Sequence, residues 1–423
     1  MLAGRASIQL CWSQRRVATS TTSPAAACRP LEWLNFFVAD VQTGLGPFLA
    51  AYLAANFWSP LHVGYVLTFG GIVTVFAQIP VGGFVDSASH KRFIVGSGLV
   101  LLAIAAVTLT LTSRAPFIYT SQGLIGLAGA AIPTCIAAIT LGITGQHLFD
   151  RQFGRNQSFN SAGNVAAALL IAVIAWLFGV HWIFLSAIIF AIPAALSLAR
   201  INPAWIDDRR ARAASDDTAH TSSANFRSLL RSPMLLALLL AAFLFHLSNA
   251  AMLPQLGELL SHGQSRKAAP FMSACIITTQ VVITLTASSI GRLASRIGRK
   301  PFLLAGFACL PIRGVLYAMT HDTALLIAIQ VLDGVANSIF GVVTILSVKD
   351  LTRGSGRFNL VAGALATFVG TGAALSPALG GEIIQHFNYP ASFLTLGAVG
   401  VLALLVILLF VPETLHRNPL QSG

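Results

Sequence analysis

The sequence predicts an all-α polytopic membrane protein with 12 transmembrane helices in two pseudo-symmetric six-helix bundles. Hydrophobic residues make up 55% of the 423-residue chain and charged residues only 9%, whereas an ordinary soluble domain carries about 25% charged residues. A short basic segment that begins at Gly82 returns at Gly291, half a chain later. The composition indicates a membrane protein, and the recurrence indicates an internal repeat.

The apolar stretches are long enough to cross a bilayer as helices, because a span needs about 20 residues for about 30 Å of hydrocarbon. Strands of a β-barrel would be shorter and would alternate apolar with polar residues, which the runs 101–107 and 401–410 do not do. The predicted spans lie at 33–57, 62–85, 93–112, 116–145, 158–179, 182–200, 233–260, 269–290, 301–319, 323–347, 358–385 and 391–411.

The spans divide the chain into two halves flanked by polar segments. The N-terminal bundle is predicted at 32–200 and the C-terminal bundle at 233–414, joined by a mixed-charge cytoplasmic linker at 201–232. Residues 1–31 contain Arg, Ser and Thr but no acid, which is typical of a transit peptide. A disordered extension is the interpretation we favour for them, and 415–423 are expected to form a cytoplasmic tail.

Positive charge falls on one side of the predicted membrane. With the N-terminus in the cytoplasm, 22 of the 26 Lys and Arg residues lie in cytoplasmic segments, and the exceptions are Arg114, Arg266, Lys267 and Arg313. This bias follows the positive-inside rule and places both termini in the cytoplasm. It also explains the net charge of +12 without nucleic-acid binding. We therefore expect a multi-pass protein of the plasma membrane, which in a bacterium is the inner membrane.

The two halves match at several positions with a nearly constant offset. The loop Gly82-Gly-Phe-Val-Asp86, closed by His90-Lys91-Arg92, returns 209 residues later as Gly291-Arg-Leu-Ala-Ser295-Arg296-Ile-Gly298-Arg299-Lys300. Gln122 in the fourth span corresponds to Gln330 in the tenth at an offset of 208. Pro47 corresponds to Pro254 at 207. Offsets this steady predict two bundles with the same chain path.

Over residues 32–414 these motifs resemble the major facilitator superfamily of secondary transporters, whose signature loop is Gly-x-x-x-Asp-Arg/Lys-x-Gly-Arg-Lys/Arg. The first copy keeps the glycine and the acid, the second keeps the basic string with Ser295 in place of the acid, and Pro412-Glu413-Thr414 resembles the family's usual tail. The resemblance implies a cytoplasmic gate between the bundles, formed by Gly82, Asp86, Lys91, Arg92, Gly291, Arg296, Gly298, Arg299 and Lys300. Glycine in the loop is expected to let a neighbouring helix approach closely. The alternative is that the basic residues serve only as topology signals.

Few ionisable residues lie within the spans, and each is a functional candidate because charge in hydrocarbon is costly. Asp40 lies in the first span, and Arg313 and Asp333 reach a similar depth on the ninth and tenth spans. An Arg313–Asp333 ion pair is therefore possible, and a pair turned away from the space between the bundles would give Asp333 a structural role. Asp40 and Asp333 are the alternative candidates for carrying protons, because burial favours the protonated carboxyl.

Polar side chains also form stripes along otherwise apolar helices. Gln330, Asp333 and Asn337 share one face of the tenth span, and His246 and Asn249 share one face of the seventh. The resemblance implies that the first, fourth, seventh and tenth spans line a central cavity. The predicted cavity residues are Asp40, Gln42, Gln122, His246, Asn249, Gln330, Asp333 and Asn337. Interhelical hydrogen bonds are the alternative role for both glutamines, and a simple hydrogen bond is the alternative for His246.

We expect a secondary transporter that exports a small organic molecule with protons by alternating access. The alternatives are proton-coupled uptake of a small metabolite and a non-transporting membrane sensor on the same fold. Drug–proton antiporters of the family usually carry Arg where this chain has Gln122, which weakens a drug-antiporter assignment. No catalytic or phosphate-binding motif occurs, and the five cysteines include no CxxC pair, so no enzyme activity, metal or cofactor is expected. The expected partners are the substrate, protons and lipid, with no nucleic acid, and the protein is expected to be a monomer.

Overall fold

The computed structural model describes residues 24–39, 45–88, 90–211, 232–261, 265–352 and 358–415. Within these ranges every regular element is helical, which confirms the predicted all-α class. The described residues include eleven helical segments that are long and apolar enough to cross a membrane, and Gly46–Ala55 is a shorter apolar helix. The described part of the chain is therefore a multi-pass helical bundle.

The described part of the N-terminal half contains six helices, followed by a short one in the predicted linker. They are α1 (Pro24–Phe37), α2 (Leu45–Ala55), α3 (Pro60–Ser87), α4 (Lys91–Leu111), α5 (Ala115–Phe178), α6 (Leu185–Ala199) and α7 (Asp208–Ala211). The single-turn elements η2 (Val180–Trp182) and η3 (Pro203–Trp205) flank α6. Helix α5 includes two predicted spans. The helix is interrupted at Gly145, whose φ of 66° lies in the left-handed region. Glycine tolerates that conformation without a side-chain clash. The second membrane segment of α5 starts at Arg151, whereas the sequence predicted a start at residue 158.

The C-terminal half follows the same path. Its helices are α9 (Pro233–Asn249), α10 (Met252–Ser261), α11 (Ser265–Ile297), α12 (Lys300–Met319), α13 (Thr323–Ile339), α14 (Ile345–Leu351), α15 (Phe358–His386) and α16 (Tyr389–Phe410). A π-helical turn, η4 (Phe340–Thr344), joins α13 to α14 within one span. The repeat of the sequence therefore corresponds to a repeat of helices.

The first and seventh spans are each divided into two helices, which the apolar pattern alone did not predict. The seventh breaks between α9 and α10, where the backbone N–H of Ala251 donates to Ser376 Oγ at 2.9 Å. A backbone group freed inside a membrane needs such a partner, because no water is available there. The first is divided into α1 and α2, and residues 40–44 between them lie outside the described ranges. The short arms α2 and α10 pack against each other across the two halves.

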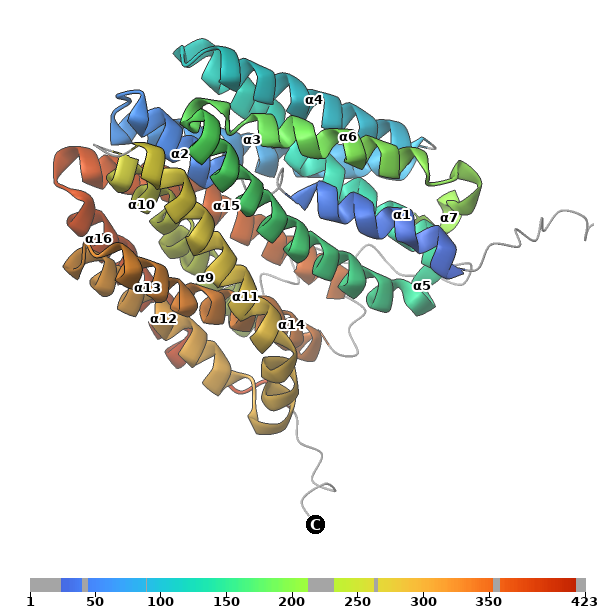
Figure 1. The fold of residues 1–423 in the computed structure, drawn as a ribbon. Coiled ribbons are helices and arrows are strands. Elements are labelled where there is room, and N and C mark those ends of the chain that lie inside the picture. The colour runs from blue at the N-terminus through green and yellow to red at the C-terminus, as the bar shows by residue number, and fades with distance from the viewer. Residues whose placement is uncertain are drawn as a thin grey trace, which may run out of the picture.

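The halves converge at the end that holds α2 and α10 and diverge toward the ends that hold α7 and α14 (Figure 1). At the converging end one apolar core combines both halves. We call this the joint core, and it includes Phe48, Tyr52, Val66, Met252, Met272 and Phe393. At the other end each half has a core of its own, around Leu34 and Val95 in the first half and around Leu303 and Val343 in the second. One end of the bundle is thus sealed by packing between the halves, and the other is not.

Helices α3 and α15 form the longest contact between the halves. A Cβ added to Gly64 would lie 2.4 Å from the carbonyl oxygen of Pro377, and one added to Gly71 would lie 2.7 Å from the Ala374 Cβ. The Ala378 N–H donates to Thr68 Oγ1 at 3.0 Å across the same contact. Residues without a side chain therefore let the two backbones approach closely here.

Candidate transport cavity

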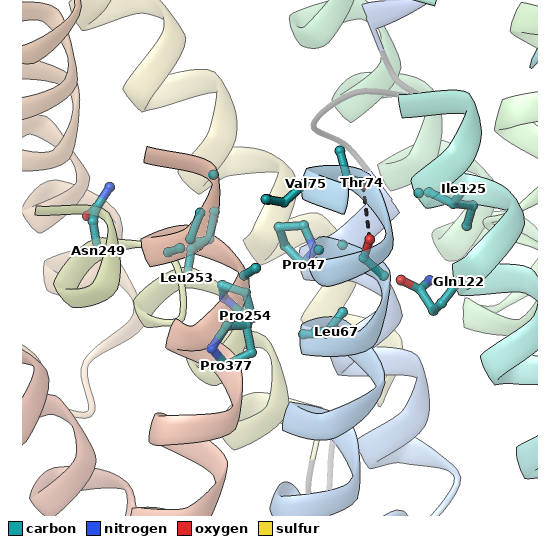
Figure 2. Close-up of a pocket in the computed structure, with 18 of the residues that line it drawn as sticks. Pro47, Leu67, Thr74, Val75, Gln122, Ile125, Asn249, Leu253, Pro254 and Pro377 are labelled. Carbon is teal, nitrogen blue, oxygen red and sulfur yellow. Dashed lines mark hydrogen bonds between the residues drawn. The ribbon is translucent and has the colours of Figure 1, made fainter. Parts of the chain in front are cut away.

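A central cavity of about 570 Å³ lies between the halves, next to the joint core. Its walls come from α2, α3 and α5 on one side and from α9, α10, α12, α13 and α15 on the other. Gln122 and Ile125 approach it from the first half, and Asn249 and Leu253 from the second (Figure 2). Much of the lining is Gly, Ala, Pro and Leu, and the polar side chains are a minority that comes from both halves: Thr74, Gln78 and Gln122 from the first and Asn249, Arg313 and Asp333 from the second. A volume of this size suits a small organic ligand.

The charged part of the lining is an ion pair in the second half. Arg313 Nη1 lies 2.6 Å from Asp333 Oδ1, joining α12 to α13, and the Arg313 side chain is only 1% exposed. Both residues line the cavity. Burial of either charge alone would be strongly unfavourable, and the pair neutralises both. The cavity wall therefore carries two opposite charges without a net charge.

Neutral polar groups surround this pair. Arg313 also donates to the Asn249 side-chain oxygen, and Asn337 Nδ2 donates to Asp333 Oδ1 at 2.9 Å. Thr279 Oγ1 donates to Asp333 Oδ2 at 3.1 Å, and the Tyr317 ring lies under the guanidinium, 5.4 Å from its carbon. We call these six residues the polar cluster: Asn249, Thr279, Arg313, Tyr317, Asp333 and Asn337. Its members come from α9, α11, α12 and α13, all in the second half.

Asp333 also borders a second, smaller cavity. This space of about 140 Å³ lies between α2, α5, α10 and α11, and its lining includes Asn164, Thr279 and Gln280. The two oxygens of Asp333 have different partners, since Oδ1 meets Arg313 and Oδ2 meets Thr279. The carboxyl group therefore stands between two spaces of different size.

The predicted cavity residues fall into three groups. Gln122, Asn249 and Asp333 line the central cavity, and Asn337 joins them through Asp333. Gln330 is fully buried, and its side-chain oxygen lies 3.5 Å from Thr279 Oγ1. His246 packs edge-on against the Phe340 ring, with centroids 4.8 Å apart, and is not part of the cavity lining. Asp40 and Gln42 lie outside the described residues.

Comparison with known proteins decides the family. The sequence profile described as Major Facilitator Superfamily matches residues 33–289 and 270–423. The chain belongs to the Major Facilitator Superfamily. It is 38% identical over 406 residues to a protein of Mycobacterium tuberculosis named as an MFS-type transporter, covering 95% of this chain and 96% of that one. This major facilitator protein is thus a relative of transporters rather than of enzymes.

More distant similarities cover less sequence or only the fold. The multidrug efflux pump LfrA of Mycolicibacterium smegmatis is 29% identical over 141 residues, 33% of this chain and 28% of that protein. The solved structure of the nucleoside transporter NupG superposes with a TM-score of 0.71 at 15% identity, covering 92% of this chain and 98% of that one. A D-xylose-proton symporter superposes with 0.69 at 15% identity and the same coverage. The structural matches show the fold of this major facilitator protein.

The second signature loop binds residues of its own half. Arg299 Nε lies 3.1 Å from Asp350 Oδ2, and Lys300 Nζ donates to the Leu408 carbonyl at 2.8 Å. Glu413 accepts the backbone N–H groups of Arg299 and Lys300 at 2.8 and 3.1 Å, which caps the start of α12. Gly298 has φ of 140°, and a Cβ there would lie 2.4 Å from the Glu413 carboxylate. The conformation and the close approach both require glycine at this position.

Glu413 titrates abnormally because of that cap. Burial alone would raise its pKa, but backbone N–H groups of Arg299, Leu415 and Lys300 stabilise the charged form, and the net result is a pKa below the ordinary value. The sequence pattern identified Pro412-Glu413-Thr414 only as a family-like tail. The structure gives the glutamate a definite partner, the first turn of α12.

The first signature loop makes equivalent contacts within the first half. Lys91 is 1% exposed and its Nζ lies 3.0 Å from Asp208 Oδ1 in α7. Arg92 donates to the Ala199 carbonyl at 3.1 Å. A Cβ added to Gly82 would meet nothing within 4 Å, and at Gly291 only Val342 lies at 3.4 Å. The expected tight helix approach at these two glycines is therefore absent from this conformation, because that end of the bundle is the diverging one.

Of the remaining gate candidates, Arg296 has a described side chain and Asp86 does not. Arg296 borders a shallow surface pocket with Arg292 at the end of α11. The side chain of Asp86 lies outside the described part of the chain. Among the described gate residues, the hydrogen bonds and ion pairs given above all join parts of one half.

Several buried polar residues were not identified from the sequence. Thr279 and Tyr317 complete the polar cluster. Because single hydroxyl groups are common in apolar spans, the sequence alone did not distinguish these two residues. Glu32 of α1 is buried and pairs with Arg155 Nε of α5 at 2.9 Å, away from the cavity. Glu258 lies in α10, and its position in the predicted span 233–260 could have identified it.

Proposed function

We propose that this major facilitator protein exports a small organic molecule in exchange for protons by alternating access. The observation that carries the proposal is the Arg313–Asp333 pair, buried in the wall of a cavity between two pseudo-symmetric halves. Burying charged side chains within a membrane costs free energy, so an ion pair in a membrane-spanning segment is a functional candidate by default. Two halves around one central site are the arrangement that alternating access requires.

The proposed orientation follows from the charge distribution. Lys and Arg concentrate in the segments at the α7 and α14 end, so we assign that end to the cytoplasm. The joint core then closes the cavity on the outer side, and the separate cores leave the halves apart on the cytoplasmic side. In this orientation the cavity opens toward the cytoplasm, where an exporter binds its substrate. The membrane would be the bacterial inner membrane, with both termini inside.

The proposed coupling residue is Asp333. A proton on its carboxylate would remove the countercharge of Arg313 and weaken the 2.6 Å contact. The protonated carboxyl would also be a poorer acceptor for a hydrogen-bond donor of the substrate in the cavity that Asp333 lines. Proton and substrate would therefore compete for one site, which is the requirement for exchange. Asp40 remains a second proton-carrying candidate from its sequence position.

The lining also limits the substrate. The charges of Arg313 and Asp333 balance, Gln122 lines the same cavity from the other half, and Gly, Ala, Pro and Leu dominate the remaining lining. We infer a largely apolar substrate with one or two hydrogen-bonding groups and no large net charge. The partial similarity to a multidrug efflux pump supports export over uptake.

Transport in proteoliposomes tests the proposal. The purified protein would be assayed against a panel of small organic compounds with and without an imposed pH gradient. We expect at least one compound to move against its gradient when the proton gradient is present. Asp333→Asn should abolish this gradient-driven movement. A panel without transported compounds would favour the non-transporting sensor, and gradient-driven movement that survives both Asp40→Asn and Asp333→Asn would exclude these carboxyls as proton carriers.

A further inference from the structure

Glu258 is an ionisable group that the transport proposal does not use. It lies in α10, the arm that packs against α2 of the other half. Its exposed fraction is 3%, and its Oε2 atom has no hydrogen-bond partner. Glutamate is almost never so buried unless it is paired. A buried carboxyl with an unpartnered oxygen at the contact between the two halves therefore needs an explanation.

The helices around Glu258 offer it no described countercharge. The one titratable residue of α2 is Tyr52, which lies 3.5 Å from His181. Tyr389, at the start of α16, interacts electrostatically with Glu258 but is a phenol and is uncharged near neutral pH. Helix α11 begins with Arg266 and Lys267, whose side chains lie outside the described part of the chain.

Two other helices carry described titratable groups, but none of these groups pairs with Glu258. On α15, Glu382 and His386 pair with each other at 3.2 Å and are half exposed. On α9, His246 packs against Phe340 several turns away from Glu258. Among the described residues, no ion pair involves Glu258. A negative charge on it would have no described countercharge in an apolar core, which is strongly unfavourable.

We propose that Glu258 is a proton-binding site that controls closure of the α2–α10 end. In the closed conformation seen here the carboxyl is neutral, because no described residue of the joint core offers a countercharge and its Oε2 has no hydrogen-bond partner. When α2 and α10 separate, the carboxyl meets water and releases its proton. Closure therefore takes up one proton and opening releases it. The inference rests on the proposed alternating access, but it depends neither on the identity of the substrate nor on Asp333.

Linkage gives the sign and the size of the effect. The closed form holds one proton more than the open form, so raising the pH favours the open form. Above the ordinary glutamate pKa of about 4.3, the ratio of closed to open molecules should fall by up to tenfold per pH unit. Acidification of the outer medium should therefore close this end.

Distances between the halves measure this equilibrium without any substrate. Phe57 follows α2 and Phe387 follows α15, and both are exposed, at 94% and 72%. Spin labels on cysteines at these two positions, in a variant whose native cysteines are replaced by alanine, would report the separation in lipid nanodiscs. Pulsed electron paramagnetic resonance would record the distribution of distances between the two labels from about pH 5 to about pH 9.

We expect two distance populations whose ratio changes with pH in the protein with Glu258. Glu258→Gln should hold the short distance at every pH, because the amide has no charge to expose. The matched control is Glu382→Gln, a half-exposed carboxyl at the same end whose amide oxygen can still accept the hydrogen bond from Tyr65 of the other half, and it should keep the pH dependence. If Glu258→Gln retains that dependence, the inference is overturned while alternating access stands. A single distance at every pH in all variants would contradict both.

A second measurement needs no substitution. Hydrogen–deuterium exchange of the unmodified protein, corrected for the intrinsic pH dependence of exchange, should show faster exchange in α10 and α2 as the pH rises. Exchange in the α4 core of the first half should not follow the same trend. Corrected exchange in α10 that is independent of pH would overturn the inference even if the glutamine variant failed to fold.

Discussion

The two halves share a chain path but contribute different chemistry to the cavity. In the second half, Asp333 pairs with Arg313 and accepts a hydrogen bond from Asn337. At the positions that the repeat relates to Asp333 and Asn337, the first half has Ile125 and Gly129. The charged pair thus exists once, although the scaffold exists twice.

The first half places its buried polar network elsewhere. Glu32 of α1 pairs with Arg155 and accepts from Gln152, and Gln152 in turn donates to Asn156 of the same helix. None of these residues lines the central cavity. The difference shows that a repeat fixes helix positions but not polar chemistry. The first half supplies a neutral wall and the second half supplies charge.

The largest expected effect comes from breaking the ion pair on one side only. Asp333→Leu leaves Arg313 buried without a countercharge, which should cost about 3–5 kcal/mol. Thermal unfolding in nanodiscs, followed by circular dichroism, should show a marked drop in the midpoint. Ile125→Leu, at the equivalent place in the first half, is the control and should change little.

A double replacement separates stability from function. Arg313→Met with Asp333→Leu removes both charges and should recover most of the lost stability, because apolar residues of similar size can replace a buried pair. Transport should remain absent. A double variant as unstable as Asp333→Leu would mean that the pair is not the source of the destabilisation.

The next effect concerns the glycines of the α3–α15 contact. Gly64→Ala places a Cβ 2.4 Å from the Pro377 carbonyl oxygen, and overpacking of this kind costs about 1–3 kcal/mol. Gly83→Ala is the matched control in the same helix, since a Cβ there would meet nothing within 4 Å. The unfolding midpoint should fall for the first variant only. Equal midpoints would mean that the two halves can separate here without cost.

The ion pairs of the two signature loops, Arg299–Asp350 and Lys91–Asp208, should contribute smaller and unequal amounts to the free energy of unfolding. Asp350→Asn removes the charge that faces the buried Arg299, and this should cost about 1 kcal/mol. Asp208→Asn should cost less, because the Asp208 side chain is 37% exposed and water already screens its interaction with Lys91. Unfolding midpoints of the two variants should therefore rank in that order. The reverse order would show that the first loop is the tighter one.

The smallest effect is expected at the cap of α12. The lowered pKa of Glu413 means that its carboxylate stabilises the fold above the ordinary glutamate pKa, and that this contribution is lost as the pH falls through the lowered value. Glu413→Gln should destabilise by about 0.5 kcal/mol near neutral pH, as for loss of a weak cap. The difference between the variant and the unmodified protein should vanish in acid. A difference that persists there would indicate a role other than charge.

Much of the fold follows from the sequence because apolar length and the repeat are strong signals. The all-α class and the family were predicted from residues such as Gly82, Gly291 and Gln330. The division of the seventh span was not, because the break at Ala251 depends on Ser376, a hydrogen-bond partner 125 residues away. Such a tertiary contact leaves no local pattern.

The site was predictable to the extent that charge in a span is rare. Arg313 and Asp333 stood out for that reason, and the structure brings them together. Thr279 and Tyr317 did not, because only the packing of α11 and α12 gives them a role. His246 belongs to a polar stripe in the sequence, yet it packs against Phe340 instead of lining the cavity.

Substrate exchange in proteoliposomes tests most directly whether the second half's carboxyl couples protons. A transported compound would be followed in two modes: counterflow without a pH gradient, and accumulation with one. We predict that Asp333→Asn retains counterflow, since the amide still reaches Thr279 and Asn337, and loses accumulation. Accumulation at the unmodified rate in Asp333→Asn would contradict the account.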